Sequence, residues 1–463
     1  MSKELVRRLG LFSAVMLLIG TVIGSGIFKK PAVMAGYLQS PELLIAVWVV
    51  AGLVTFFGAL TNAEVSGLFE KTGGQYLYFR TMYGDFFAYL FGWSMLAVIQ
   101  CGSQAAIAYI FAEYLGYFVA YPQHWSQDDY ALWLPLVGDI YPLKELPTKL
   151  VAVGAILLLT AINYVGVYAG GVVQNVLTSI KIGAMLLLVL FLFLLGKQGN
   201  VDNFWTDAPN FAHFSFLQTL SAFGLAMSGA FWAYDGWNNI TFVTGEMHNP
   251  QKNIPRAFFL GTLSVIAIYV LINLAYLYVL PIDKMAQSKL VAATAAEIVM
   301  GEVGASFIAV AVIISTFGSL NGSLLASARI PFAMAKDKLF FTHFGQVHPR
   351  FHTPHFALLV QGIWAAILVF SGTFDIITDY VIFAAWLYYA SAGLGIFILR
   401  WRMPEAHRPY KVWAYPLPPL IFVAFSFFFL INTCIAAPEK AAMGILLIAL
   451  GIPFYAYLKR KKD

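Results

Sequence analysis

The chain has 463 residues, of which 60% are hydrophobic and only 11% are charged, and its formal net charge is +5. Soluble domains carry about 25% charged residues, so this composition excludes a water-soluble protein and predicts lipid around most of the surface. We expect no nucleic-acid partner and no cofactor. Both cysteines, Cys101 and Cys434, lie in apolar runs, which indicates neither a disulfide framework nor a metal site.

The apolar residues gather into segments long enough to cross a bilayer, which takes about 20 residues of helix. Twelve such segments predict an all-α integral membrane protein, a single polytopic domain over residues 1–463. The segments lie at 10–36, 42–69, 84–119, 149–168, 172–196, 215–245, 256–281, 303–335, 356–372, 376–400, 417–436 and 440–458.

Lysine and arginine favour the cytoplasmic loops of membrane proteins. With a cytoplasmic N-terminus, the inner segments hold nineteen of these residues and the outer loops hold six. An even number of spans returns the C-terminus to the same side. The pattern therefore predicts a multi-pass protein of the cell membrane with both termini in the cytoplasm.

The first apolar segment contains an unusual run, GTVIGSGIF at residues 20–28. Glycine weakens a helix by about 1 kcal/mol relative to alanine, and an unwound backbone at membrane depth is tolerated only around a cavity. Freed N–H groups at a helix start bind carboxylates. The run therefore favours a site for the carboxylate of an amino acid, although Gly20 and Gly24 also suit close helix packing. Lys29 and Lys30 follow, and we expect both to be solvated and to face the outer vestibule; the alternative is that they attract an anionic group.

Lys181 lies within the apolar segment 172–196. A buried ammonium must meet carbonyl or carboxylate oxygens or lose its proton. Lys181 could replace a bound sodium ion by joining its helix to the first break, or it could extend to the cytoplasmic rim. The sequence leaves both interpretations open.

A second break is indicated at residues 228–239, SGAFWAYDGWNN. Asp235 lies near the middle of the segment, and a charge at that depth indicates function by default. Carbonyls freed around Phe231 to Tyr234 could accept hydrogen bonds from a substrate ammonium, and Trp232 could act as an aromatic gate. The alternative is an aspartate paired within the helix bundle. Breaks at matching places in two halves of a chain are typical of secondary transporters.

A membrane-embedded enzyme is the remote alternative. The eight histidines fall in loops or at helix ends, and no nucleophile or phosphate-binding motif accompanies them. We therefore expect no catalytic residues and no metal site.

Five motifs in order resemble the L-type amino acid transporter family of the amino acid–polyamine–organocation superfamily over nearly the whole chain. They are GTVIGSGIF (20–28), NAEVSGLFEKTGGQYLYF (62–79), FWAYDGWNNITFVTGEMHNPQKNIPRA (231–257), STFGSLNGSLLASAR (315–329) and HPRFHTP (348–354).

The resemblance implies a LeuT-like fold of two inverted five-helix repeats, residues 10–196 and 215–400, followed by two additional helices at 417–458. It also implies sodium-independent exchange of small to medium L-amino acids by alternating access. A proton-coupled amino acid or polyamine symporter remains the alternative.

The resemblance also assigns roles to residues. It implies that the substrate carboxylate is held by Val22, Gly24, Ser25 and Gly26. It implies that the ammonium and the gate are served by Phe231, Trp232 and Ala233, that Asn238 supports the second break, and that Lys181 and Ser323 occupy the place of a sodium site.

Two departures from the family pattern refine this expectation. Many neutral-specific animal members have a small residue where this chain has Asp235, so cationic substrates are also expected. Animal members bond to a heavy chain through a cysteine between their third and fourth helices, and residues 120–148 contain none. We therefore expect a stand-alone, prokaryotic carrier.

Overall fold

The fold is almost entirely helical in the computed structural model, which describes residues 9–69, 74–127, 129–134, 138–165, 171–196, 199–209, 211–351 and 353–460. Two short strands, β1 (Leu132–Leu134) and β2 (Gly138–Ile140), pair antiparallel. The chain divides into two compact units, and each unit draws on three separate stretches of sequence.

Unit 1 comprises residues 1–72, 170–315 and 405–436. Its α-helices are α1 (Leu11–Val22), α2 (Gly26–Leu38), α3 (Pro41–Gly67), α8 (Gly171–Leu195), α9 (Phe216–Tyr234), α10 (Pro250–Val279), α11 (Ile282–Gln287) and α16 (Leu417–Ala436). It also contains the 3-10 helices η3 (Val201–Phe204), η4 (Phe211–His213) and η5 (Trp237–Glu246). Helix α12 (Val291–Ser327) begins in unit 1 and ends in unit 2.

Unit 2 comprises residues 73–169, 316–404 and 437–463. Its α-helices are α4 (Gln75–Tyr83), α5 (Asp85–Ser94), α6 (Gln100–Leu115), α7 (Leu146–Val165), α13 (Arg329–Lys336), α14 (His355–Leu368), α15 (Phe374–Arg402), α17 (Pro438–Ala449) and α18 (Gly451–Arg460). The π-helix η1 (Met95–Ile99) joins α5 to α6, and η2 (Gln123–Trp125), η6 (Thr342–Gly345) and η7 (Val369–Ser371) are short 3-10 turns.

Among the described residues, nine helices are long and apolar enough to cross a membrane, and the bent pair α1 and α2 makes a tenth span. This confirms the prediction of a polytopic helical membrane protein. Each of the twelve predicted segments contains helix, but α9 is not among these spans and α14 with η7 forms only a shorter apolar helix. The count of twelve and the two inverted repeats therefore stay predictions.

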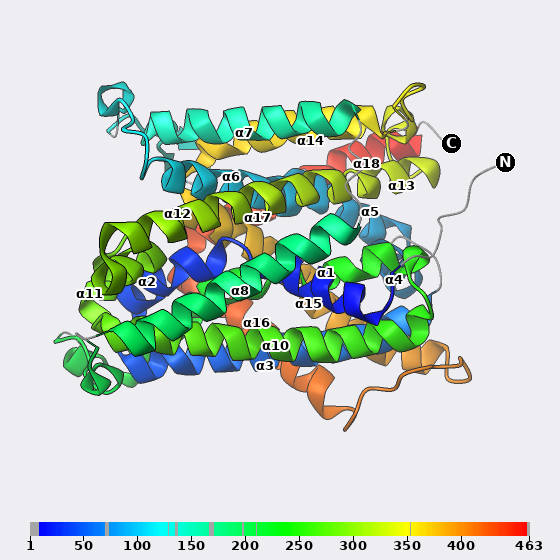
Figure 1. Ribbon diagram of the computed structural model, residues 1–463. Coiled ribbons are helices and arrows are strands. Elements are labelled where there is room, and N and C mark those ends of the chain that lie inside the picture. The colour runs from blue at the N-terminus through cyan, green and yellow to red at the C-terminus, as the bar shows by residue number, and fades with distance from the viewer. Residues whose placement is uncertain are drawn as a thin grey trace. The chain divides into compact units, whose positions relative to one another are not determined.

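Helices α3 and α10 run side by side in unit 1 (Figure 1). Each begins with proline in its first turn, where the missing N–H costs nothing. A Cβ on Gly52 of α3 would lie 2.7 Å from Ile266 of α10 and 2.8 Å from the Tyr234 hydroxyl. Only glycine allows this approach, and it fixes α3 against both α9 and α10.

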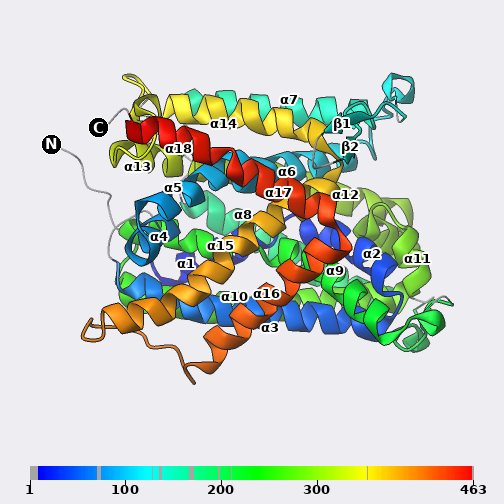
Figure 2. The same ribbon diagram turned by 180° about the vertical axis from the view of Figure 1, so that it is seen from behind.

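Unit 2 has a close helix pair of its own, α7 with α14, which lie side by side in Figure 2. A Cβ on Gly362 of α14 would lie 2.2 Å from the Thr160 hydroxyl of α7. Helices α15 and α17 are joined by an ion pair in which Lys440 Nζ lies 2.7 Å from Asp379 Oδ2.

Candidate functional site

The first predicted break lies between α1 and α2, which meet at an angle of 43° (Figure 1). Helix α1 ends at Val22 and α2 begins at Gly26, so the unwound residues are 23–25. Ser25 is only 2% exposed, and its side chain makes no capping hydrogen bond. The glycine-rich run therefore interrupts the helix where the sequence indicates.

The second predicted break follows α9. This helix starts at a capping box in which the Ser215 side chain accepts from Gln218 N, and it ends at Tyr234. Asp235 is extended and Gly236 is left-handed with φ of +98°, after which the chain continues as the 3-10 helix η5. A Cβ on Gly236 would lie 2.8 Å from the Thr21 carbonyl oxygen, so both the backbone angle and the space require glycine.

The two breaks lie against each other within unit 1. A Cβ on Gly26 would lie 2.6 Å from the Ala233 Cα and 3.0 Å from the Trp232 ring. The Thr21 hydroxyl lies 3.2 Å from the Gly236 carbonyl oxygen, to which it can donate a hydrogen bond, and 2.9 Å from the Leu17 and Leu18 carbonyl oxygens of its own helix. The sequence predicted each break separately, and the structure brings their residues into contact.

Several backbone N–H groups at the first break lack a backbone hydrogen-bond acceptor among the described residues. The N–H of Ile23 bonds the Ile19 carbonyl, and the N–H of Phe28 bonds the Ser25 carbonyl. Within the described part of the chain, the N–H groups of Gly24, Ser25 and Ile27 have no backbone acceptor. Buried N–H groups without partners are rare in proteins, and at the start of a helix they form an anion site.

Tyr269 of α10, which the sequence analysis missed, joins the two breaks. Its fully buried hydroxyl lies 3.1 Å from the Val22 carbonyl oxygen and 2.9 Å from the Ala233 carbonyl oxygen, and it donates to these acceptors. Its ring packs against Trp48 of α3 and Tyr234 of α9, with centroids 5.5 and 5.1 Å away. No motif marked Tyr269, because a tyrosine in an apolar helix is ordinary until its partners are known.

Asn238 occupies a position that suits its predicted supporting role. It is 3% exposed, and its Oδ1 accepts a short hydrogen bond from Asn62 Nδ2 of α3. Its carbonyl accepts from the Thr241 hydroxyl at 2.8 Å. Asn238 thereby ties the segment after the second break to α3.

The remaining residues of the second break differ in exposure. Phe231, Trp232 and Ala233 are buried, at 1%, 8% and 1% exposed, whereas Asp235 is half-buried and caps the end of α9. The expectation of a solvated Lys30 is wrong, because Lys30 is 1% exposed. Its aliphatic stem packs near Gly229 of α9, where a Cβ would lie 3.5 Å from the Lys30 Cδ.

Lys181 and Ser323 lie in different units, so their predicted cooperation stays a prediction. Lys181 is half-buried on α8. Ser323 belongs to a polar network in unit 2, where its hydroxyl donates to Gln100 Oε1 at 3.3 Å and accepts from Gln104 Nε2 at 3.3 Å. Gln104 Nε2 also donates to the Ser327 hydroxyl at 2.9 Å, and that hydroxyl lies 3.0 Å from Gln361 Oε1.

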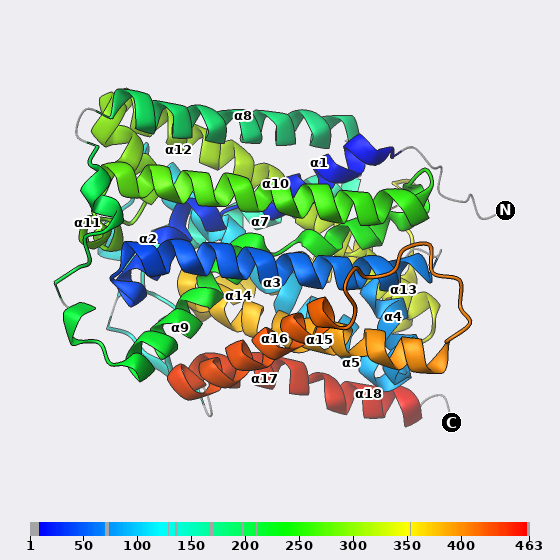
Figure 3. The ribbon, with the colours of Figure 1, turned by 90° about the horizontal axis from the view of Figure 1, so that it is seen from below.

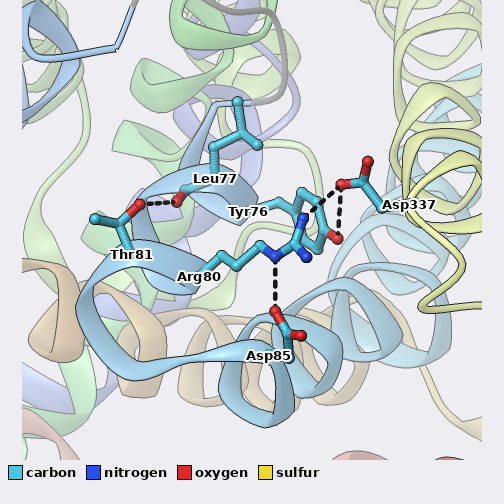
Figure 4. Close-up of polar contacts among 6 residues, drawn as sticks. All are labelled: Tyr76, Leu77, Arg80, Thr81, Asp85 and Asp337. Atoms are coloured by element: carbon cyan, nitrogen blue, oxygen red, sulfur yellow. Dashed lines mark hydrogen bonds and ion pairs between the residues drawn. The ribbon is translucent and has the colours of Figure 1, made fainter.

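A second polar cluster in unit 2 surrounds Arg80 of α4 (Figure 4). Arg80 Nε lies 2.6 Å from Asp85 Oδ1, and its Nη1 lies 3.3 Å from Asp337 Oδ2, at the end of α13. The buried Tyr76 hydroxyl donates to the same Asp337 oxygen at 3.1 Å. Burial and the charge of Asp337 raise the pKa of Tyr76, and the hydrogen bond to Asp85 raises the pKa of Arg80.

In the part of the chain that the structure describes, no group of three or more His, Cys, Asp or Glu side chains is placed to bind a metal. The site instead consists mainly of backbone groups at two helix breaks. A many-span helical protein whose broken helices meet in this way belongs to the secondary transporters.

Comparison with known proteins gives the family. Residues 9–456 match the amino acid permease family, to which this chain belongs. The chain is 32% identical over 461 residues to the serine/threonine exchanger SteT of Bacillus subtilis, covering 99% of this chain and 98% of SteT. It is 32% identical to the human b(0,+)-type amino acid transporter 1, covering 98% and 88%. It is 31% identical to the human large neutral amino acids transporter small subunit 2, covering 97% and 80%.

These relatives are b(0,+)-type, large neutral amino acid and serine/threonine carriers, so the predicted resemblance to the L-type transporters within this superfamily is confirmed. Membership of a permease family also confirms a transporter rather than an enzyme.

Proposed function

We propose that this chain exchanges small to medium L-amino acids, neutral and also cationic, across the cell membrane by alternating access and without sodium. The carrying observation is the contact between the two helix breaks. Free N–H groups at Gly24, Ser25 and Ile27 lie on one chain segment, and the end of α9 approaches it at Ala233. A zwitterionic amino acid carries a carboxylate, which suits the N–H groups at a helix start, and an ammonium, which suits the carbonyl groups at a helix end.

The substrate carboxylate binds the N–H groups around residues 22–26, where the helix dipole also favours negative charge. The substrate ammonium binds at the carbonyl end of α9, which residues 231–233 form. Trp232, whose ring lies beside Gly26, closes over the bound amino acid in this proposal. Asn238 holds the second break to α3 through Asn62.

Three relatives support exchange as the mode of transport and amino acids as the cargo, because one is a serine/threonine exchanger and two are amino acid transporters. We extend this cargo to the present chain. Both termini are proposed to face the cytoplasm. No disulfide-linked heavy chain is proposed, since residues 120–148 contain no cysteine, Cys101 is buried, and the exposed Cys434 lies on α16.

The decisive experiment is counterflow in proteoliposomes that are made with the purified chain. We expect uptake of labelled alanine or serine to rise when unlabelled amino acid is present inside, and to be unchanged by sodium. Uptake that ignores internal amino acid would contradict exchange. Uptake that a protonophore abolishes would instead support the alternative proton-coupled symporter.

Lys181 is proposed to take the place of a sodium ion together with Ser323. We expect Lys181→Ala to lower transport far more than it lowers the amount of folded protein. Lys181→Arg is the matched control, because it keeps the charge. If Lys181→Ala turns over at the wild-type rate, Lys181 has no role in transport, and its side chain only extends to the membrane rim.

Asp235 is proposed to widen the substrate range towards cationic and polar amino acids. It is the C-cap residue of α9, where its backbone N–H bonds the Trp232 carbonyl, and its carboxylate adds negative charge at the helix end that receives the ammonium. We expect Asp235→Gly to lose lysine and arginine as competitors of labelled alanine. If the twenty amino acids compete with labelled alanine equally well in the variant and in the wild type, Asp235 does not set the substrate range.

A further inference from the structure

Helix α16 lies outside the two predicted five-helix repeats, and the sequence assigned it no role. In unit 1 it packs against both α3 and α9 (Figure 3). Its contacts with α9 extend from Ser221 to Phe231, which lies one helical turn before the second break.

The C-terminal half of α16 holds α9 before the break. A Cβ on Gly224 of α9 would lie 2.2 Å from Asn432 Nδ2, so the two helices approach as closely as glycine allows. Asn432 Nδ2 also donates to the Ser221 carbonyl at 3.3 Å. This contact fixes the position of α9 about three to four turns ahead of its end at Tyr234.

One turn earlier on α16, Phe429 contacts Phe231, a residue of the proposed substrate site. Phe429 is 0% exposed, and its ring meets the Phe231 ring edge to face, with centroids 5.3 Å apart and planes at 88°. Edge-to-face pairs are a favoured aromatic geometry. Phe231 therefore has its ring orientation set by a residue that belongs to a different helix.

The N-terminal half of α16 holds the chain after the break. The Phe422 ring lies 6.4 Å from Trp237, the first residue of η5, with planes at 87°. The same ring fills the space over Gly58 of α3, where a Cβ would lie 2.5 Å away. Helix α16 thus contacts the residues on both sides of Asp235 and Gly236.

The segment that leads into α16 is itself anchored to α3. Glu64 of α3 is 1% exposed and forms an ion pair with Arg408, whose Nε lies 3.2 Å away. Its other oxygen accepts a hydrogen bond from Val412 N at 2.7 Å. Breaking a buried pair of this kind is strongly destabilising, so the start of α16 is held to α3.

We propose that α16 bridges the second helix break and that Phe429 is a positioning residue, which sets the size selectivity for the substrate through Phe231. The inference rests on the proposed function, because Phe231 is assigned to the substrate site. Phe429 prevents the Phe231 ring from moving away from the substrate, since packed interiors have no spare volume. Removal of the Phe429 ring opens that volume, and the Phe231 ring moves into it.

The test compares the KM for alanine with the KM for leucine in counterflow. In Phe429→Ala we expect the KM of leucine relative to alanine to fall by about 10-fold, the size of effect that a changed apolar pocket gives. Phe429→Leu leaves a smaller void and shifts the ratio in the same direction by less, which keeps the test open if the alanine variant does not fold. Phe427→Ala is the matched control, because Phe427 lies on the same helix and is 46% exposed.

A double-mutant cycle separates positioning from general destabilisation. In a Phe231→Ala background, Phe429→Ala should leave the KM ratio unchanged, because the ring it positions is gone. The inference is overturned if folded Phe429 variants keep the wild-type ratio, or if the ratio shifts equally in both backgrounds. A wild-type chain that exchanges no amino acid overturns the proposed function as well, whereas normal wild-type exchange with unchanged Phe429 variants overturns only the inference.

Discussion

The helix breaks of unit 1 and the polar network of unit 2 differ in how far their polar groups are hydrogen-bonded to other parts of the protein. At the breaks, the polar groups belong to the backbone, and the N–H groups of Gly24, Ser25 and Ile27 have no backbone acceptor in the described residues. In unit 2, α6, α12 and α14 supply glutamine and serine side chains that bond one another. Side-chain groups that bond one another stabilise a fold, although Gln104 Oε1 has no partner among the described residues. The backbone N–H groups at the breaks are available to a ligand.

The largest expected effect comes from Gly26→Ala. The new Cβ would lie 2.6 Å from the Ala233 Cα, so the backbones at the two breaks must separate. Overpacking costs about 1–3 kcal/mol, and a misplacement of about 1 Å at a reacting site can cost about 100-fold. We expect exchange in proteoliposomes to fall by about that factor.

Gly36→Ala on the same helix is the matched control, because a Cβ there meets no atom within 4 Å. It should melt at or above the wild-type temperature, with normal exchange. Equal activity of the two variants would show that the contact between Gly26 and Ala233 is not needed for transport.

Tyr269→Phe should have the next largest effect. It removes the hydroxyl that joins the Val22 and Ala233 carbonyls and leaves buried acceptors without this donor, at about 1–3 kcal/mol. We expect the exchange rate to fall about 10-fold, measured as initial counterflow at saturating substrate.

Tyr276→Phe removes a buried hydroxyl from the same helix. In the described part of the chain that hydroxyl has no hydrogen-bond partner, so its loss should leave both melting and exchange unchanged. If both tyrosine variants behave alike, the hydroxyl of Tyr269 has no special role.

Gln104→Leu should separate stability from transport. It removes the donor to the half-buried Ser323 hydroxyl and to the buried Ser327 hydroxyl. The loss of a hydrogen-bond donor to a buried hydroxyl costs about 1–3 kcal/mol. We expect a lower melting temperature in detergent with an unchanged KM for alanine. A raised KM with normal melting would place Gln104 in the substrate site instead.

Ser103→Ala is the control for that variant, since the Ser103 hydroxyl bonds only the Ile99 carbonyl, at the end of the adjoining η1, in the contacts described. Its melting temperature should stay close to the wild-type value.

The smallest effect is expected for Asp337→Asn in the cluster of Figure 4. The Arg80 and Asp337 side chains are 39% and 37% exposed, and pairs with this exposure contribute about 0–1 kcal/mol. The loss of melting temperature should shrink in high salt, which screens exposed charges. Tyr76→Phe removes only the hydroxyl donor, so its change in melting temperature should not depend on salt. If salt changes the melting temperatures of both variants equally, the ion pair between Arg80 and Asp337 does not contribute to stability.

The sequence alone determined that the chain lies in a membrane, and it located both helix breaks. Hydropathy and glycine content are local properties, so residues 20–28 and 228–239 reveal their character without knowledge of their neighbours. Asn238 could likewise be named from the motif, but its partner Asn62 on α3 could not.

Only the tertiary structure decided which distant side chains meet. Tyr269 bonds a carbonyl 247 residues away, Lys30 is buried although its neighbours in sequence suggested solvent, and α16 contacts both sides of the second break. Each of these facts depends on packing between helices. Apolar helices in lipid have similar patterns, and the choice among their possible partners rests on shape and close approach, which no single segment encodes.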